Sequence, residues 1–257
     1  MKRPTASILF FFILCSANWA SAHFGMIIPS RNILLPADKT VTLTLSFSHP
    51  FAGIGMDIAK PESFFMESAG KKTELTDSLR PTSVMAKKSW QADVQIKRPG
   101  VYWFVMEPTP YFDVPEDIFI IHYSKTAVAA YGADSGWDTP VGLATEIIPL
   151  LRPFGNYAGN TFVGKVLVKG IPAAHIEVEV EYYNREKKVA AASDYHITQI
   201  IQTDENGNFS FTCPLPGWWG FAALSEADYT LTGPDGKEKQ VELGAILWLY
   251  MDKYSFQ

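Results

Sequence analysis

Cysteine and basic residues are scarce in this sequence, and several catalytic motifs are missing. The chain has 2 cysteines among 257 residues and a formal net charge of −5 at pH 7. This charge balance offers no basic surface that would attract nucleic acid or anionic lipid. The chain also lacks GxSxG, HExxH and CxxC motifs and a glycine-rich nucleotide-binding loop. These absences predict a protein that is not an enzyme and has no nucleic-acid partner.

The first 22 residues have the pattern of a secretory signal peptide. Lys2 and Arg3 precede a short apolar segment, ILFFFIL at residues 8–14, and the small residues Ala20-Ser21-Ala22 form the cleavage pattern. The apolar segment is shorter than the roughly 20 residues that a membrane span needs. We therefore expect an exported, soluble protein with no membrane span after cleavage. Cleavage would also remove Cys15 and leave no partner for a disulfide, so stability must come from a packed core.

The rest of the chain reads as β-strands joined by turns. Residues 40–49 (TVTLTLSFSH) alternate apolar and polar side chains, which predicts a half-buried strand. Residues 101–106 (VYWFVM) and 117–123 (DIFIIHY) are continuous apolar runs, which predict strands buried on both faces. Asn206-Gly207 indicates a hairpin turn. The strongest helical candidate, residues 142–151, is interrupted by Pro149, so we expect an all-β fold.

The spacing of the strands predicts two β-sandwich domains after the signal peptide. The segment RPFGNYAGN, at residues 152–160, is rich in Gly, Pro and Asn and marks the break. We expect an N-terminal β-sandwich domain at residues 23–155 and a second domain at residues 156–257. The second domain resembles transthyretin-like and Cna-B-like modules in its segments GKVLVKGIPAAHIEVEV, TDENGNFSF and PGWWGFAAL. That resemblance concerns fold and not function.

His23 is the first candidate metal ligand. Cleavage after Ala22 would make it the first residue of the mature chain. Its free α-amine and its imidazole could then close a chelate ring on one metal ion. The apolar residues that follow it, FGMIIPS, could pin this terminus into the fold.

Two further histidines are candidate ligands. His49 ends the alternating strand at residues 40–49, and the alternation predicts that it faces inward like Phe47. It is therefore either a metal ligand or a histidine at the edge of the core that is bonded to a carbonyl group. His122 lies in a buried run and needs partners for both ring nitrogens, which are either two hydrogen bonds or one hydrogen bond and one metal ion. His175 lies on an acidic strand face and His196 in a turn-like segment, so we expect both to be exposed.

Several blocks of the sequence resemble exported proteins of the DUF4198 family. They are HFGMIIPS, SFSHPF with GMD, GVYWFVMEPTPY, EDIFIIHYSKT, PLLRPFGNYAGN, and PGWWGFAAL with VELGAILWLY. The most similar group is described as the periplasmic component of an ABC-type, energy-coupling-factor-type nickel or cobalt uptake system. The resemblance implies a periplasmic protein that binds Ni²⁺ or Co²⁺ and assists the membrane subunits of a metal importer. His23, His49 and His122 fall within the matching blocks and are the expected metal ligands.

Two other functions stay open at this point. Amine and imidazole nitrogens suit Ni²⁺ and Co²⁺ but bind Cu²⁺ more tightly by the Irving–Williams order. An N-terminal histidine on a β-sandwich also describes copper proteins, either oxidative enzymes or copper carriers. The transthyretin-like second half equally fits a structural carrier or adhesion module. Additional donor candidates near the same end of the chain are Met26, Met56, Asp57 and Glu107.

Overall fold

The computed structural model describes residues 23–255, and this part of the chain is built almost entirely of β-strands. Its helical elements are two short 3-10 helices, η1 (Thr76–Ser78) and η2 (Asp194–His196). The predicted all-β sandwich fold is confirmed. The predicted signal peptide, residues 1–22, lies outside the described residues. Cys213 is buried and free, and burial raises the pKa of its thiol.

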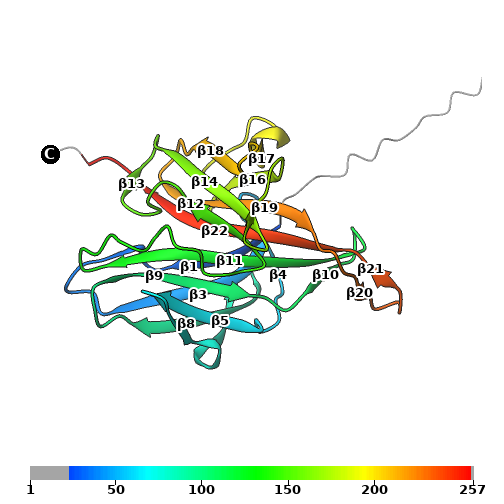
Figure 1. Ribbon diagram of the computed structural model, residues 1–257, viewed down its shortest axis with the longest axis horizontal. Coiled ribbons are helices and arrows are strands. Elements are labelled where there is room, and N and C mark those ends of the chain that lie inside the picture. Colours follow the sequence, from blue (N-terminus) through cyan, green and yellow to red (C-terminus); the bar gives the residue numbers. More distant parts are fainter. Residues whose placement is uncertain (1–22, 256–257) are drawn as a thin grey trace, which may run out of the picture.

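A sheet of 11 strands forms the middle layer of the molecule, with the main order β17-β16-β19-β22-β11-β9-β5-β6 (Figure 1). Strands β11 and β22 are parallel neighbours, and Phe119 pairs with Val241. Strands from both halves of the chain therefore share one sheet. The strands of this sheet are β2 (Ile33–Leu34), β5 (Ser63–Ser68), β6 (Lys71–Glu74), β9 (Gly100–Glu107), β10 (Tyr111–Asp113), β11 (Ile118–Ala130), β13 (Asn156–Tyr157), β16 (Glu177–Tyr182), β17 (Gln199–Gln202), β19 (Gly217–Glu226) and β22 (Val241–Asp252).

A sheet of five strands covers one face of the middle layer. Its strand order is β1-β3-β8-β7, and β4 pairs with β3. The inward residues of β3, such as Leu43 and Leu45, pack in one core with Phe64 and Phe104 of the long sheet. The predicted alternation of residues 40–49 is thus confirmed. The strands of this sheet are β1 (Phe24–Pro29), β3 (Thr40–His49), β4 (Ile54–Met56), β7 (Arg80–Val84) and β8 (Lys87–Gln95).

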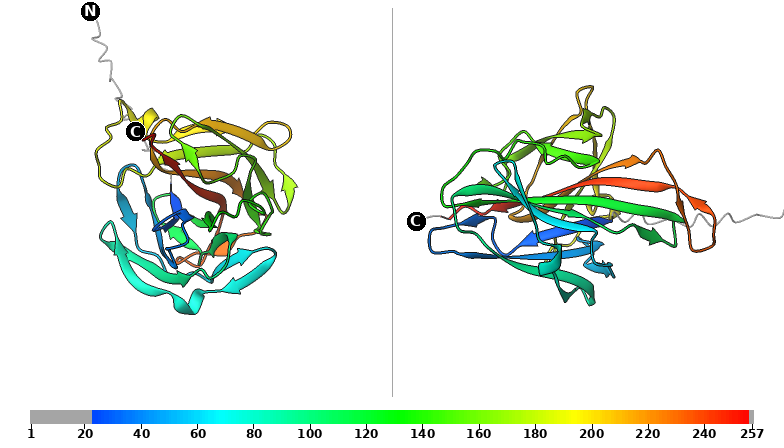
Figure 2. Two further views of the ribbon diagram at one scale, coloured as in Figure 1. Left: turned by 90° about the vertical axis from the view of Figure 1, so that its left-hand side faces the viewer. Right: turned by 60° about the horizontal axis from the view of Figure 1, so that its bottom comes forward.

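A sheet of four strands covers the opposite face, where β17, β16 and β19 continue the long sheet (Figure 2). Phe162 and Phe209 of this sheet pack against Phe221 of β19 in a second core. The strands of this sheet are β12 (Thr145–Pro149), β14 (Thr161–Val168), β15 (Ile171–Pro172) and β18 (Asn208–Thr212). A separate hairpin of β20 (Leu231–Thr232) and β21 (Glu238–Lys239) leads into β22.

The continuous apolar runs have a simple structural cause. Alternate residues of β9 face opposite cores, because Trp103 and Val105 join one core while Tyr102 and Phe104 join the other. Residues 101–106 are all buried. The prediction that this run is a strand buried on both faces is confirmed.

One local prediction, the hairpin at Asn206-Gly207, was wrong, and the interrupted helical candidate is a strand. Residues 145–149, inside the helical candidate at 142–151, form strand β12, which pairs with β14 and is buried along its whole length. The Asn206-Gly207 segment does form a tight turn, but the flanking strands do not pair with each other. Strand β17 joins β16, whereas β18 joins β14 in another sheet. The Asn-Gly pair determines that the chain reverses its direction. Which strands pair with the two flanking strands depends on how the faces of those strands are buried.

The division of the chain near residue 155 into two domains stays a prediction. Among the described residues, no helix has the length and apolar character needed to cross a membrane.

Candidate metal centre

The start of strand β1 is pinned to the centre of the molecule. Phe24 and Met26 are fully buried, and the indole Nε1 of Trp248 donates a hydrogen bond of 2.9 Å to the carbonyl oxygen of Gly25. A side chain at Gly25 would lie 2.4 Å from Oγ of Ser124, so only glycine lets β1 approach β11 this closely. The backbone next to His23 is therefore held in one place, as we expected from its apolar neighbours.

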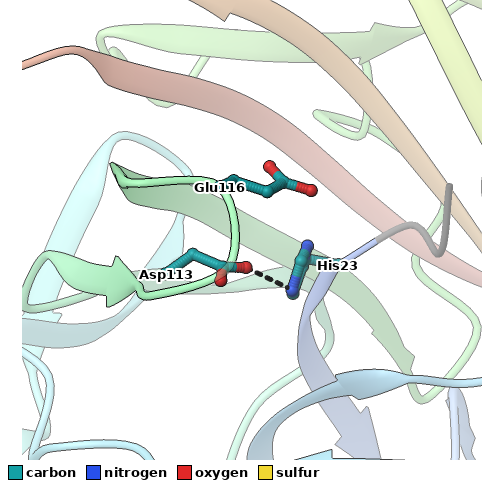
Figure 3. A group of neighbouring side chains, drawn as sticks. All are labelled: His23, Asp113 and Glu116. Atoms are coloured by element: carbon teal, nitrogen blue, oxygen red, sulfur yellow. Dashed lines mark ion pairs between the residues drawn. The ribbon is translucent and has the colours of Figure 1, made fainter. Parts of the chain in front are cut away.

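His23 lies beside two carboxylates. Its Nε2 atom is 3.0 Å from Oδ2 of Asp113, and their side chains are largely buried. His23, Asp113 and Glu116 form a group whose ligand atoms all lie within 4.8 Å of one another (Figure 3). Asp113 ends β10, and Glu116 lies in the turn that leads to β11. These three residues can supply one imidazole and two carboxylate groups to a cation.

The β1–β3 register brings His49 to His23. Phe24 pairs with Ser48, so the residue before β1 lies opposite the last residue of β3. The two imidazole rings have centroids 4.6 Å apart and planes inclined by 51°. His23 and His49 are thus neighbours in space.

His122 is near His23 but outside the group around Asp113. Its side chain is 2% exposed, and its Nε2 is 3.2 Å from Oε1 of Glu242. The ring lies against Gly244, where any side chain would collide with it. Phe47 contacts both imidazoles, stacking on His23 at 5.5 Å and meeting His122 edge-on at 5.6 Å. The three predicted ligands therefore lie close together. Among the described residues, however, only His23 of the three belongs to the candidate metal-binding group with Asp113 and Glu116.

The surroundings hold the imidazole of His23 neutral. Burial, followed by the nearby His49 and His122, lowers its pKa from 6.5 to about 4, against an opposing effect of Glu242. A neutral imidazole has a lone pair that can bind a metal ion. His23 is therefore available as a ligand at neutral pH.

The carboxylates around His23 repel one another. Burial raises the pKa of Glu116, and Asp113 and Glu242 raise it further. Burial, with Glu242 as the next largest cause, raises the pKa of Glu179 to about 8. Burial also acts to raise the pKa of Glu242, but hydrogen bonding and charge interaction with His122 outweigh it and the pKa is lowered. A divalent cation bound here would relieve this repulsion.

The other candidate residues are placed elsewhere. His175 is exposed and pairs with Glu205 at 3.3 Å, and His196 contacts Ser193 in an exposed turn, as the sequence predicted. The candidate donor Asp57 accepts the backbone N–H of Lys88. Glu107 lies 3.8 Å from Lys72, and Met26 accepts a hydrogen bond from Ser48 in the core.

Sequence reasoning missed Asp113 and Glu116. Their only sequence signal is the segment DVPED directly before the strand that carries His122. A turn rich in Asp, Glu and Pro is ordinary on a surface, so nothing in this segment alone distinguished it.

The chain was compared with curated proteins, with solved structures and with protein families. No curated protein matches it by sequence. Among solved structures, the D0-D1 domain of intimin is 13% identical with a TM-score of 0.23, and the match covers 90% of this chain and 100% of that chain. The major pilin subunit BcpA of Bacillus cereus is 13% identical with a TM-score of 0.20, covering 91% and 69%. A two-domain fibronectin type-III segment of chicken tenascin is 14% identical with a TM-score of 0.21, covering 88% and 99%.

Similarity at this level carries no argument about function. The family comparison is more informative, because a family model described as a domain of unknown function, DUF4198, matches residues 20–227. That range includes His23, His49, Asp113, Glu116 and His122. The chain belongs to the DUF4198 family.

Proposed function

We propose that the protein binds a divalent transition-metal ion, Ni²⁺ or Co²⁺, at His23 and hands it to the membrane subunits of an ABC- or ECF-type importer in the periplasm. The observation that carries the metal-binding part is the position of the His23 imidazole, 3.0 Å from Asp113 and in ring contact with His49. The transporter role rests on the resemblance of the sequence blocks described above.

The hydrogen bond to Asp113 favours a chelating tautomer of His23. A carboxylate only accepts hydrogen bonds, so its contact with Nε2 places the ring proton there and the lone pair on Nδ1. The α-amine of an N-terminal histidine closes a chelate ring with Nδ1. Carboxylate contacts of this kind orient histidine ligands and raise their basicity. The chelate requires cleavage directly before His23, because an amide nitrogen is no ligand of this type.

The proposed donor set is His23, His49 and the carboxylate of Glu116, with Asp113 orienting His23. This mixture of nitrogen and oxygen donors suits borderline divalent ions. We leave His122 out of the set, because its Nε2 is bound to Glu242 and it is not part of the group that His23 forms with Asp113 and Glu116.

Calorimetry with NiCl₂, CoCl₂, CuCl₂ and ZnCl₂ tests metal binding. The chain that begins at His23 is compared with a chain that has one added glycine before His23. Loss of the amine ligand should weaken binding at least about tenfold, which corresponds to about 1.4 kcal/mol. His175→Ala is the matched control and should leave the affinity unchanged. Equal affinities of the two chains would overturn the role of the terminal amine, and no binding by either would overturn the metal site.

Metal accumulation in cells tests the transporter role separately. Cells that lack the protein should take up less nickel or cobalt, and the wild-type chain should restore uptake. A purified protein that binds metal in calorimetry but does not change uptake would keep the metal site and exclude the role in import.

A further inference from the structure

A cavity of about 250 Å³ lies between the five-stranded sheet and the long sheet, next to His122. Phe47 of β3 and Ile120 of β11 form part of its wall. Three prolines, Pro61, Pro108 and Pro110, also line it, the first from the segment before β5 and the other two from the segment after β9. A space lined mostly by rigid apolar and aromatic residues is typical of sites for small organic ligands.

The size of the cavity limits its ligand. A cavity of about 150 Å³ holds benzene, and one water molecule occupies about 30 Å³ in the liquid. This cavity therefore has room for one aromatic ring with a short substituent.

His122, one of the residues that line the cavity, has a buried ring nitrogen without a partner among the described residues. The Nε2 of His122 faces the carboxylate of Glu242, which can only accept, so Nε2 carries a proton. In the neutral form of the ring the lone pair then lies on Nδ1. This Nδ1 atom is buried and has no hydrogen-bond partner among the described residues. Buried polar atoms are rarely left unpaired in native proteins, so an unpaired one calls for a ligand or water. A ligand with an O–H or N–H group could provide the missing donor.

The charge of the lining excludes anionic ligands. Asp57 is the one acidic residue among those that line the cavity, and no lysine or arginine lines it. Asp57 also lies at an exposed position on the rim. A negatively charged ligand would find no counter-charge here and would lose its hydration.

We propose that this cavity binds a small neutral aromatic compound whose ring packs against the prolines and Phe47, and whose O–H or N–H group donates a hydrogen bond to Nδ1 of His122. The site differs from the proposed metal centre, since His23, His49, Asp113 and Glu116 do not line the cavity. The proposal therefore does not rest on metal binding.

NMR titrations with phenol, toluene and benzoate on metal-free full-length protein test the proposal. Phenol should shift the ring resonances of His122 and bind about tenfold more tightly than toluene, which fits the space but has no donor. Benzoate should not bind. This comparison uses unchanged protein, so it does not depend on a variant that folds.

A cavity-filling variant provides the second measurement. Ala59→Phe, at an exposed residue that lines the cavity, should weaken phenol binding at least about tenfold, which is about 1.4 kcal/mol. Ala192→Phe, at another exposed position, is the control and should have no effect. Equal binding of phenol and toluene would overturn the role of His122. Absence of phenol binding, or binding unaffected by Ala59→Phe, would overturn the site itself.

Discussion

The imidazole rings of His23 and His49 lie 4.6 Å apart because strands β1 and β3 pair in one register. A shift of this pairing by one residue would turn one of the two side chains to the other face of the sheet. The buried side chains of Phe24 and Met26 prevent such a shift. The metal centre that we propose therefore depends on the packing of β1 as much as on the histidines themselves.

His49→Ala should weaken metal binding at least about tenfold, or about 1.4 kcal/mol, because it removes one nitrogen donor beside His23. Calorimetry on the chain that begins at His23 measures the effect. His196→Ala removes an exposed histidine and is the matched control. If both variants bind like the wild type, His49 is not a ligand.

Asp113→Asn keeps the size of the side chain but removes its charge. We expect metal affinity to fall about 10–100-fold, as is usual when the carboxylate partner of a histidine ligand is removed. Asp134→Asn, at an exposed position, controls for the change in net charge. An unchanged affinity for the Asp113 variant would show that its contact with His23 has no part in metal binding.

Glu181 should make the protein less stable as the pH rises. The side chain is fully buried and accepts hydrogen bonds from Phe51 and Thr198. Burial raises its pKa from 4.5 to about 7, although these hydrogen bonds oppose the shift. The native state therefore holds this proton more tightly than the unfolded state. The resulting stabilisation is present below pH 4.5 and is lost as the pH rises through 7.

Glu181→Gln should remove that dependence, because the amide stays neutral. Its oxygen can accept the N–H of Phe51, while its NH₂ group can donate to the hydroxyl of Thr198. We expect the variant to be more stable than the wild type by about 2–3 kcal/mol at pH 8 and similar at pH 4. Urea unfolding at the two pH values measures the difference. Glu177→Gln, on the same strand but exposed, should change neither value by more than about 0.5 kcal/mol. Parallel pH profiles of wild type and Glu181→Gln would contradict the prediction.

Lys125→Met should destabilise the fold by about 3–5 kcal/mol, because it leaves the buried carboxylate of Glu146 without its partner. Lys125 and Glu146 are 1% and 2% exposed, and Nζ lies 3.3 Å from Oε2. Lys169→Met breaks an exposed pair with Asp228 and should cost less than about 1 kcal/mol. Thermal or urea unfolding compares the two variants. Similar losses of stability would mean that burial adds nothing to the Lys125 pair.

The local pattern of the sequence predicted several strands correctly. The alternation of residues 40–49 matches β3, and the apolar run at residues 101–106 lies within β9. Residues 142–151 show the limit, because β12 is buried on both faces and so has no alternation to recognise. A short buried strand and a buried helical segment cannot be separated by periodicity alone.

For the candidate site, the sequence by itself determined that His23 follows a cleavage pattern and that His49 and His122 occupy strand positions. Only the tertiary structure decided which groups meet them. Strand pairing put His49 beside His23, the turn before β11 added Asp113 and Glu116, and the parallel pairing of β11 with β22 added Glu242. Periodicity specifies the face of a strand on which a side chain lies. Contacts between distant strands depend on how whole sheets pack, and a short segment of sequence does not determine that packing.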